Sequence, residues 1–204
     1  MGVSDLLKLT PDAKIHKNDP RLCSDATDWL DISPGQKFTS EGATLRALHC
    51  PGHTSDHMAL VLEEEDAMFT GDNVLGHGTA VFEDYATYMS SLSTMSKEFN
   101  GRAYPGHGAV IDNGKDRVNE YIAHRQDREK QVMSVMASEG QGRRQGTEGW
   151  TAIEIVKIIY KDYPENLHEP AERGVRQILD KLKQDGKAWS PDDETTWLLG
   201  KSNL

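Results

Sequence analysis

The sequence contains three turns in which a residue able to bind a metal follows a glycine: Cys50-Pro51-Gly52-His53-Thr54, Phe69-Thr70-Gly71-Asp72-Asn73 and Tyr104-Pro105-Gly106-His107-Gly108. Glycine lets the backbone turn sharply at each of these positions. The first two turns close apolar, strand-like segments, so we expect a sheet to present the three side chains along one rim. Two imidazoles and one carboxylate suit a zinc site. The sequence therefore predicts His53, Asp72 and His107 as metal ligands.

The bulk composition describes a globular chain without a membrane partner. Its 204 residues carry a formal net charge of −10 and are 36% hydrophobic and 27% charged. That length fits one domain with a small appendage. No run of about 18 apolar residues indicates a membrane span. The acidic balance argues against broad nucleic-acid binding, because phosphates would be repelled on average.

The ends and the cysteines point to a cytoplasmic protein. The first residues lack the basic and apolar segments of a signal peptide. Cys23 and Cys50 are the only cysteines, which is too few for the disulfide framework of a small secreted protein. We therefore expect a reduced, cytoplasmic compartment.

Strands and helices alternate around the three turns. Hydrophobic patterning predicts helices over residues 3–9, 84–99 and 115–138 and strands over 13–16, 43–50, 57–63 and 67–70. The last two strands resemble a hairpin. The apolar residues of segment 84–99 recur at helical spacing, so we expect that face to pack in a core.

The last third of the chain predicts a separate small module. Residues 140–146 are rich in glycine and polar residues and form a candidate linker. Beyond it we expect a helix over 147–160 with Thr147 as its N-cap, and a second helix over 171–184. Residues 187–189 and 196–198 can pair as a hairpin. This outline is typical of a winged helix, so we divide the chain into domains 1–139 and 147–204.

Around His53, Asp72 and His107 the chain resembles the metallo-β-lactamase superfamily of hydrolases. The three residues match three ligand motifs of that family, position by position. The resemblance implies that His53 belongs to a first zinc, that Asp72 bridges two zincs and that His107 holds the second. Two zincs can share and acidify a water, which then attacks a carbonyl or phosphoryl centre. The resemblance also implies an α/β fold, the αββα sandwich.

One family motif is absent from the chain. No His-x-His-x-Asp-His occurs in the 204 residues. The resemblance implies that the chain begins just after that motif, so that most ligands of both metals and the first sheet are missing. We therefore expect a partial sandwich followed by a winged-helix-like module. We also expect at most one Zn²⁺ in place of two, and poor activity.

The segment around Asp72 narrows the resemblance. Residues 71–84 read GDNVLGHGTAVFED and are similar to fungal lactamase-type thioesterases that partner polyketide synthases, the atrochrysone carboxyl type among them. The similarity implies a thioesterase that releases a polyketide from an acyl carrier protein in secondary-metabolite biosynthesis. His77 would then line the substrate mouth, or be an ordinary loop histidine between two glycines.

Two other hypotheses stay open. Residues 156–169, VKIIYKDYPENLHE, are similar to an animal lactamase-like endoribonuclease of mitochondria. Under that hypothesis RNA phosphates would meet six basic residues: Arg143, Arg144, Arg173, Arg176, Lys181 and Lys183. Acidic residues on the same surface argue for a solvated helix face instead. The third hypothesis is a non-catalytic remnant or binding module.

Overall fold

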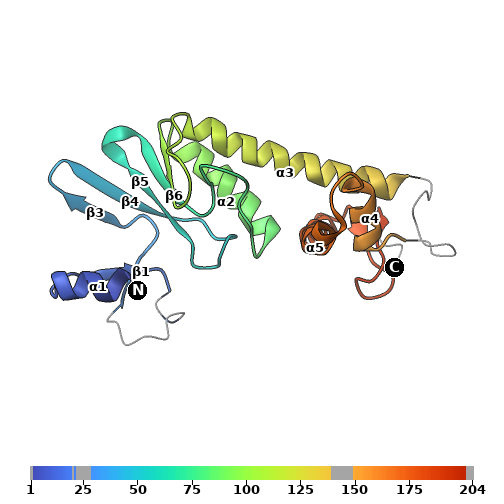
Figure 1. Cartoon of the computed structure of the whole chain (residues 1–204), viewed down its shortest axis with the longest axis horizontal. Helices are drawn as coiled ribbons and strands as arrows, with labels where there is room; N and C mark the ends of the chain where they lie inside the picture. Colours follow the sequence, from blue (N-terminus) through green and yellow to red (C-terminus); the bar gives the residue numbers. More distant parts are fainter. Residues whose placement is uncertain (1, 20, 22–28, 139–148, 201–204) are drawn as a thin grey trace.

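A computed structural model describes residues 2–19, 21, 29–138 and 149–200 and shows a mixed α/β architecture (Figure 1). Its largest sheet has five strands in the order β3-β4-β5-β6-β7. These are β3 (Lys37–Ser40), β4 (Ala43–His49), β5 (Met58–Leu62), β6 (Ala67–Gly71) and β7 (Ala103–Pro105). Neighbours from β3 to β6 are antiparallel, whereas β6 and β7 are parallel. Consequently β4, β6 and β7 run in one direction and end at one edge.

The predicted strands are largely confirmed. β4, β5 and β6 lie within one or two residues of the expected ranges, and β5 and β6 pair as the expected hairpin. The short strand expected over 13–16 is β1 (Ile15–Lys17), which pairs in parallel with β2 (Trp29–Asp31) beside helix α1 (Gly2–Leu9). Strands β2, β3 and β7 were not predicted.

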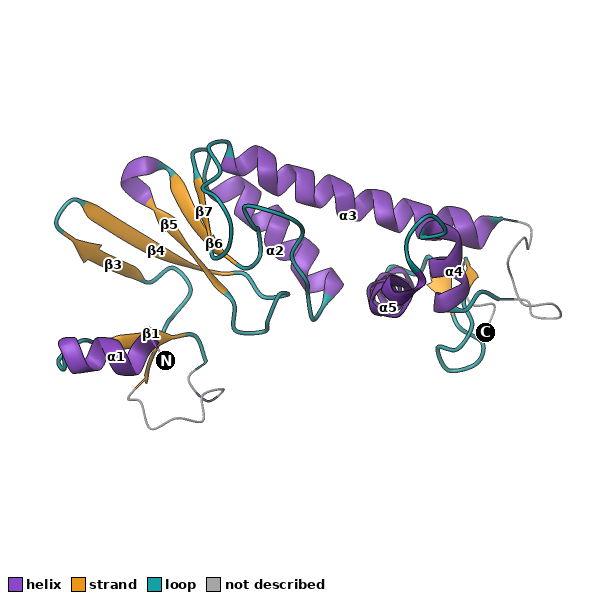
Figure 2. Ribbon diagram, viewed as in Figure 1, coloured by secondary structure: helices purple, strands orange, loops and turns teal. Residues whose placement is uncertain are grey.

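Two helices cover one face of the main sheet. Helix α2 (Tyr85–Glu98) begins where the Asp84 carboxylate accepts a hydrogen bond from the Thr87 N–H at 2.6 Å. Helix α3 (Gly114–Ala137) packs beside α2 (Figure 2). The predicted apolar face of segment 84–99 is confirmed, because its members are buried or half-buried in the core: Tyr85, Tyr88, Met89, Leu92, Met95 and Phe99.

The opposite face of the sheet is only partly covered. Leu60 lies opposite Phe69, and Phe69 lies opposite Tyr104, so the three side chains share this face. Phe69 is 40% exposed, and its ring centroid lies 5.0 Å from that of Tyr104. An apolar sheet face open to solvent agrees with the expected partial sandwich.

The C-terminal module is a winged-helix arrangement. It contains α4 (Ala152–Ile159), α5 (His168–Gln184) and the antiparallel pair β8 (Ala188–Trp189) and β9 (Leu198–Leu199). Its buried residues form a second core, which Val132 and Met136 of α3 join. With 24 residues, α3 is about 36 Å long. Figure 2 shows α3 running from the sheet to this module, so one helix serves both cores.

The predicted start of the first module helix is wrong. Thr151, not Thr147, caps α4, because its side chain accepts from the Glu154 N–H while the Glu154 carboxylate accepts from the Thr151 N–H. This reciprocal capping box satisfies two N–H groups at once. The sequence Thr-x-x-Glu was present and was overlooked. Thr147 and the linker 140–146 lie outside the described residues, so the domain division stays a prediction.

Replacing Thr151 with alanine is expected to destabilise the chain by about 1 kcal/mol, because the hydroxyl that accepts from the Glu154 N–H and donates to the Glu154 carboxylate is lost. Urea unfolding of the two proteins measures this difference. Thr195→Ala in an exposed loop is the control and should change the free energy of unfolding by less than about 0.5 kcal/mol. Equal effects from both variants would contradict the capping interpretation.

Among the helices that the structure describes, none is both long and apolar enough to cross a membrane.

Candidate metal centre

Sheet direction brings the three predicted ligands to one rim. Asp72 directly follows β6, His107 lies two residues beyond β7, and His53 lies four residues beyond β4. Because these strands end at the same edge, their following turns meet there. The structure therefore confirms the expected convergence of His53, Asp72 and His107.

Asp72 lies between the two imidazoles. Its Oδ2 atom is 3.8 Å from His53 Nε2, and its Oδ1 atom is 3.6 Å from His107 Nε2. Each imidazole thus faces a different oxygen of one carboxylate. A carboxylate approached in this way can serve two neighbouring cations, because each oxygen has its own lone pairs.

The His53 ring is held by the backbone. Its Nδ1 atom lies 2.9 Å from the Val81 carbonyl oxygen and donates to it. This hydrogen bond fixes the proton on Nδ1, so Nε2 presents its lone pair towards Asp72. A histidine that binds a metal usually donates its other ring N–H to such an acceptor. The orientation of His53 is therefore suited to metal binding.

The Asp72 carboxylate is also prepared for a cation. Its Oδ1 atom is buried and has no hydrogen-bond partner among the described residues. A buried acceptor without a partner costs free energy unless a cation or donor meets it. A Cβ at Gly106 would lie 2.6 Å from this oxygen, so glycine is the residue that leaves room for the carboxylate.

The three residues do not close around one ion by themselves. Within the described part of the chain, no group of three or more His, Cys, Asp or Glu side chains is placed to hold a metal ion. The side chain of His107 is 70% exposed, compared with 22% for His53, so the centre opens on the His107 side. Imidazole and carboxylate groups are suitable zinc ligands. Here each imidazole is paired with one oxygen of Asp72, and these pairs do not supply all the ligands that a zinc ion needs.

His57 belongs to the centre and was missed in the sequence. Its ring meets that of His53 edge-on, with 5.8 Å between the centroids, and its Nε2 donates to the Thr70 carbonyl at 3.2 Å. Burial lowers the pKa of His57, so the ring stays neutral. A Cβ at Gly71 would come within 2.7 Å of this ring. No motif in the sequence marked His57, because its position beside His53 depends on the pairing of β5 with β6.

His77 lies beside the His107 turn. The N–H of Gly76 donates to the His107 carbonyl at 2.9 Å, which ties the two loops together. A Cβ at Gly108 would come 2.8 Å from His77 Nδ1. His77 is exposed, so it stands on the open side of the centre. Its contact with a substrate stays a prediction.

Two family matches cover most of the chain. Residues 5–111 match the metallo-beta-lactamase superfamily, and residues 151–197 match the beta-lactamase associated winged helix domain. The chain belongs to the metallo-β-lactamase superfamily. The first match spans all three candidate ligands, and the second begins at Thr151, the N-cap of α4.

Fungal members of the superfamily are similar to this chain. Over 91% of the chain, it is 44% identical to the lactamase-like protein aptB of Emericella nidulans, covering 60% of that protein. It is 44% identical to the lactamase-like protein nscB of Arthroderma gypseum, over 94% of the chain and 63% of that protein. It is 43% identical to an atrochrysone carboxyl ACP thioesterase of Pseudocercospora fijiensis, over 91% of the chain and 55% of that protein. The chain thus spans less than two thirds of the length of these curated relatives.

Solved structures of the superfamily share the fold. A beta-lactamase domain protein from Burkholderia ambifaria superposes with a TM-score of 0.71 at 19% identity, covering 89% of this chain and 56% of that one. A metallo-beta-lactamase family protein from Thermus thermophilus gives a TM-score of 0.66 at 22% identity, covering 85% of this chain and 55% of that one. At these identities the likeness concerns the fold alone.

Cys50, three residues before His53, is expected to resist alkylation in the folded protein. The residue is fully buried and its thiol is free, and burial raises the thiol pKa to about 12. At pH 8 almost no thiolate is present, and the thiolate is the reactive form. Iodoacetamide labelling followed by peptide mass spectrometry should find Cys50 unmodified in buffer and modified in urea. Equal labelling rates in both conditions would refute this prediction.

Proposed function

We propose that this chain forms part of a zinc-dependent thioesterase. That enzyme would release a polyketide from an acyl carrier protein. The observation that carries the proposal is the placement of Asp72 between His53 and His107 in a chain 43% identical to an ACP thioesterase. Hydrolysis of a thioester needs an activated water and an electrophilic carbonyl, and a zinc centre serves both. The acyl carrier protein is the proposed partner, and the cytoplasm is the proposed compartment.

In this proposal His53, Asp72 and His107 would hold the zinc. When bound, zinc supplies a Lewis acid and an acidified water. The chain's own groups orient this centre: the Val81 carbonyl fixes the His53 ring, and Gly106 admits the Asp72 carboxylate. The proposal also assigns contact with the acyl group to His77, which is exposed beside the His107 turn.

The ribonuclease alternative receives less support from the charges on α5. Three of the basic residues that would meet RNA are engaged with carboxylates: Arg176 with Glu172 at 2.6 Å, Lys181 with Glu129 at 2.9 Å and Lys183 with Glu194 at 2.7 Å. Pairs of this kind leave little net positive charge for phosphates. Arg143 and Arg144 lie outside the described residues.

The 204-residue chain is expected to hydrolyse an acyl-carrier-protein thioester slowly and to bind fewer than two zinc ions, because three ligands cannot complete a dinuclear site. Thiol release should stop on addition of a chelator, and single-stranded RNA should stay intact in the same zinc-containing buffer. Metal content is measured in parallel by mass spectrometry of the dialysed protein.

Each outcome of this assay separates the hypotheses. RNA cleavage without thiol release would favour the endoribonuclease and reject the thioesterase. Absence of both activities with zinc present would favour the non-catalytic module. Fast thioester turnover with two zincs bound would support the thioesterase and contradict the expected weakness of this chain.

A further inference from the structure

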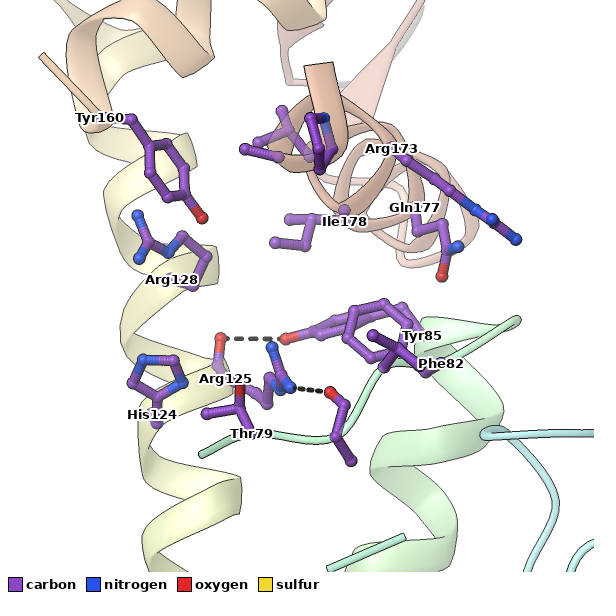
Figure 3. Close-up of a pocket in the computed structure, with 16 residues that line it drawn as sticks. Thr79, Phe82, Tyr85, His124, Arg125, Arg128, Tyr160, Arg173, Gln177 and Ile178 are labelled. Atoms are coloured by element: carbon purple, nitrogen blue, oxygen red, sulfur yellow. Dashed lines mark hydrogen bonds between the residues drawn. The ribbon is translucent and has the colours of Figure 1, made fainter. Parts of the chain in front are cut away.

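A cavity of about 420 Å³ lies between the loop 79–82, helix α3 and helix α5, outside the candidate metal centre (Figure 3). Helix α3 contributes His124, Arg125 and Arg128, and α5 contributes residues from 170 to 178. Its volume falls within the range of sites that bind small molecules. The cavity therefore has the size of a ligand site and joins the two halves of the chain.

The lining of this cavity is strongly positive in an acidic chain. It contains Arg125, Arg128 and Arg173 and no carboxylate, although the chain carries a net charge of −10. Within the described residues, no ion pair joins any of these arginines to an acidic side chain. Three guanidinium groups without counterions around one hollow favour an anionic ligand.

Aromatic rings hold two of these guanidinium groups in place. The Arg128 group lies 4.3 Å from the centroid of the Tyr160 ring, and Arg125 lies 4.8 Å from that of Phe82. Arg125 also donates from Nη2 to the Ala80 carbonyl at 2.6 Å, as Figure 3 shows. A cation–π contact restrains a guanidinium while leaving N–H donors available, which suits recognition of a phosphate.

Two polar atoms in the lining have no partner. Arg125 Nε and Gln177 Oε1 are buried and lack a hydrogen-bond partner among the described residues. In Figure 3 the Gln177 side chain points across the cavity towards Tyr85. Both atoms are covered by neighbouring atoms, so a ligand reaches them only after a small side-chain rotation, and the cost of a buried polar atom without a partner favours that rotation.

The remaining walls are apolar. The cavity is also lined by Phe82, Tyr85, Val175 and Ile178. A small inorganic ion would leave these walls unused. The lining therefore fits an anion attached to an extended, uncharged chain that carries a few polar groups.

We propose that this cavity binds the phosphate ester and adjoining chain of the phosphopantetheine arm that carries the acyl thioester. An acyl carrier protein holds its thioester at the end of such an arm, in which a phosphodiester continues into an uncharged amide chain. The proposal rests on the thioesterase function proposed above and specifies how that substrate is held.

The loop 79–82 connects the cavity with the metal centre. Val81 lines the cavity, and its carbonyl accepts the hydrogen bond from His53 Nδ1 at 2.9 Å. Arg125 holds the carbonyl of the neighbouring Ala80. An arm bound in the cavity therefore lies against the same short segment that orients His53.

Calorimetry of 4′-phosphopantetheine binding to the 204-residue chain tests this proposal. Pantetheine, which lacks the phosphate, is the comparison probe. We expect the phosphate to tighten binding about ten-fold or more, because charged hydrogen bonds to arginine are strong. The double variant Arg128→Gln/Arg173→Gln should lose that advantage. Arg176→Gln removes one positive charge from α5 outside the cavity, as Arg173→Gln removes one at its wall, and should keep the advantage.

Three results would overturn the proposal: equal affinity for both probes, an equal loss in Arg176→Gln, or a single-stranded RNA that binds more tightly and depends on the same two arginines. Circular dichroism of each variant distinguishes lost binding from lost folding, and Arg173→Gln alone provides a milder variant at an exposed position. Binding requires neither zinc nor hydrolysis. Phosphate-dependent binding without thioester hydrolysis would therefore reject the thioesterase function and support the cavity as a binding site. Thioester hydrolysis with equal affinity for the two probes would reject the cavity as a binding site and leave the thioesterase function standing.

Discussion

Replacing Asp72 with asparagine is expected to weaken zinc binding by about a hundred-fold or more and to remove the zinc-dependent hydrolysis. The carboxylate faces His53 through one oxygen and His107 through the other, so a single substitution affects both imidazole positions. An amide has one oxygen in place of two and no negative charge to offset the cation. Loss of a group that merely supports a ligand already costs about 10- to 100-fold in metal affinity.

Competition of the protein with a zinc-binding dye measures this loss, and Asp112→Asn is the matched control. Asp112 is exposed and pairs with Arg102 at 3.3 Å, away from the three turns. The control removes the same charge from the chain and should leave zinc affinity within about two-fold, because exposed pairs contribute little. Similar losses in both variants would show that net charge, rather than the Asp72 position, governs zinc binding.

The sequence predicted the three turns better than it predicted the way they meet. Glycine before His53, Asp72 and His107 marked three turns, and two of them followed recognisable strands. Convergence depends on β4, β6 and β7 sharing one direction, which is a property of strand order in the sheet. Strand β7 has three residues, too few for hydrophobic alternation to be visible. Its position came only from its pairing with β6.

The cavity could not be predicted for a related reason. Arg125 and Arg128 are three positions apart and share a face of α3, which the sequence does show. Arg173 comes from another helix, and the aromatic partners come from a loop and from Tyr160. Packing of α5 against α2 and α3 brings these groups together, and no local pattern encodes that contact. Local signals therefore identified turns and helix faces, whereas sites built between elements required the structure.

Replacing Gly52 with alanine is expected to destabilise the fold by about 3 kcal/mol or more, because backbone strain and a steric clash act together. Gly52 has a φ of +130°, and a Cβ there would lie 2.4 Å from the Cα of Tyr88 in α2. The Gly52 carbonyl also accepts from the Glu83 N–H at 2.6 Å, so the turn cannot move away without losing this contact. His53 follows directly, and zinc affinity should fall together with stability.

Gly35→Ala separates the two causes. Gly35 also has a positive φ, +82°, but a Cβ there would meet nothing within 4 Å. This control carries the backbone strain alone and should cost about 1 to 2 kcal/mol. Urea unfolding of both variants gives the difference, which combines the clash with α2 and the additional strain of the larger φ at Gly52. If the two variants were equally destabilised, close packing of the His53 turn on Tyr88 would contribute nothing, and the glycine would be required there only for its backbone conformation.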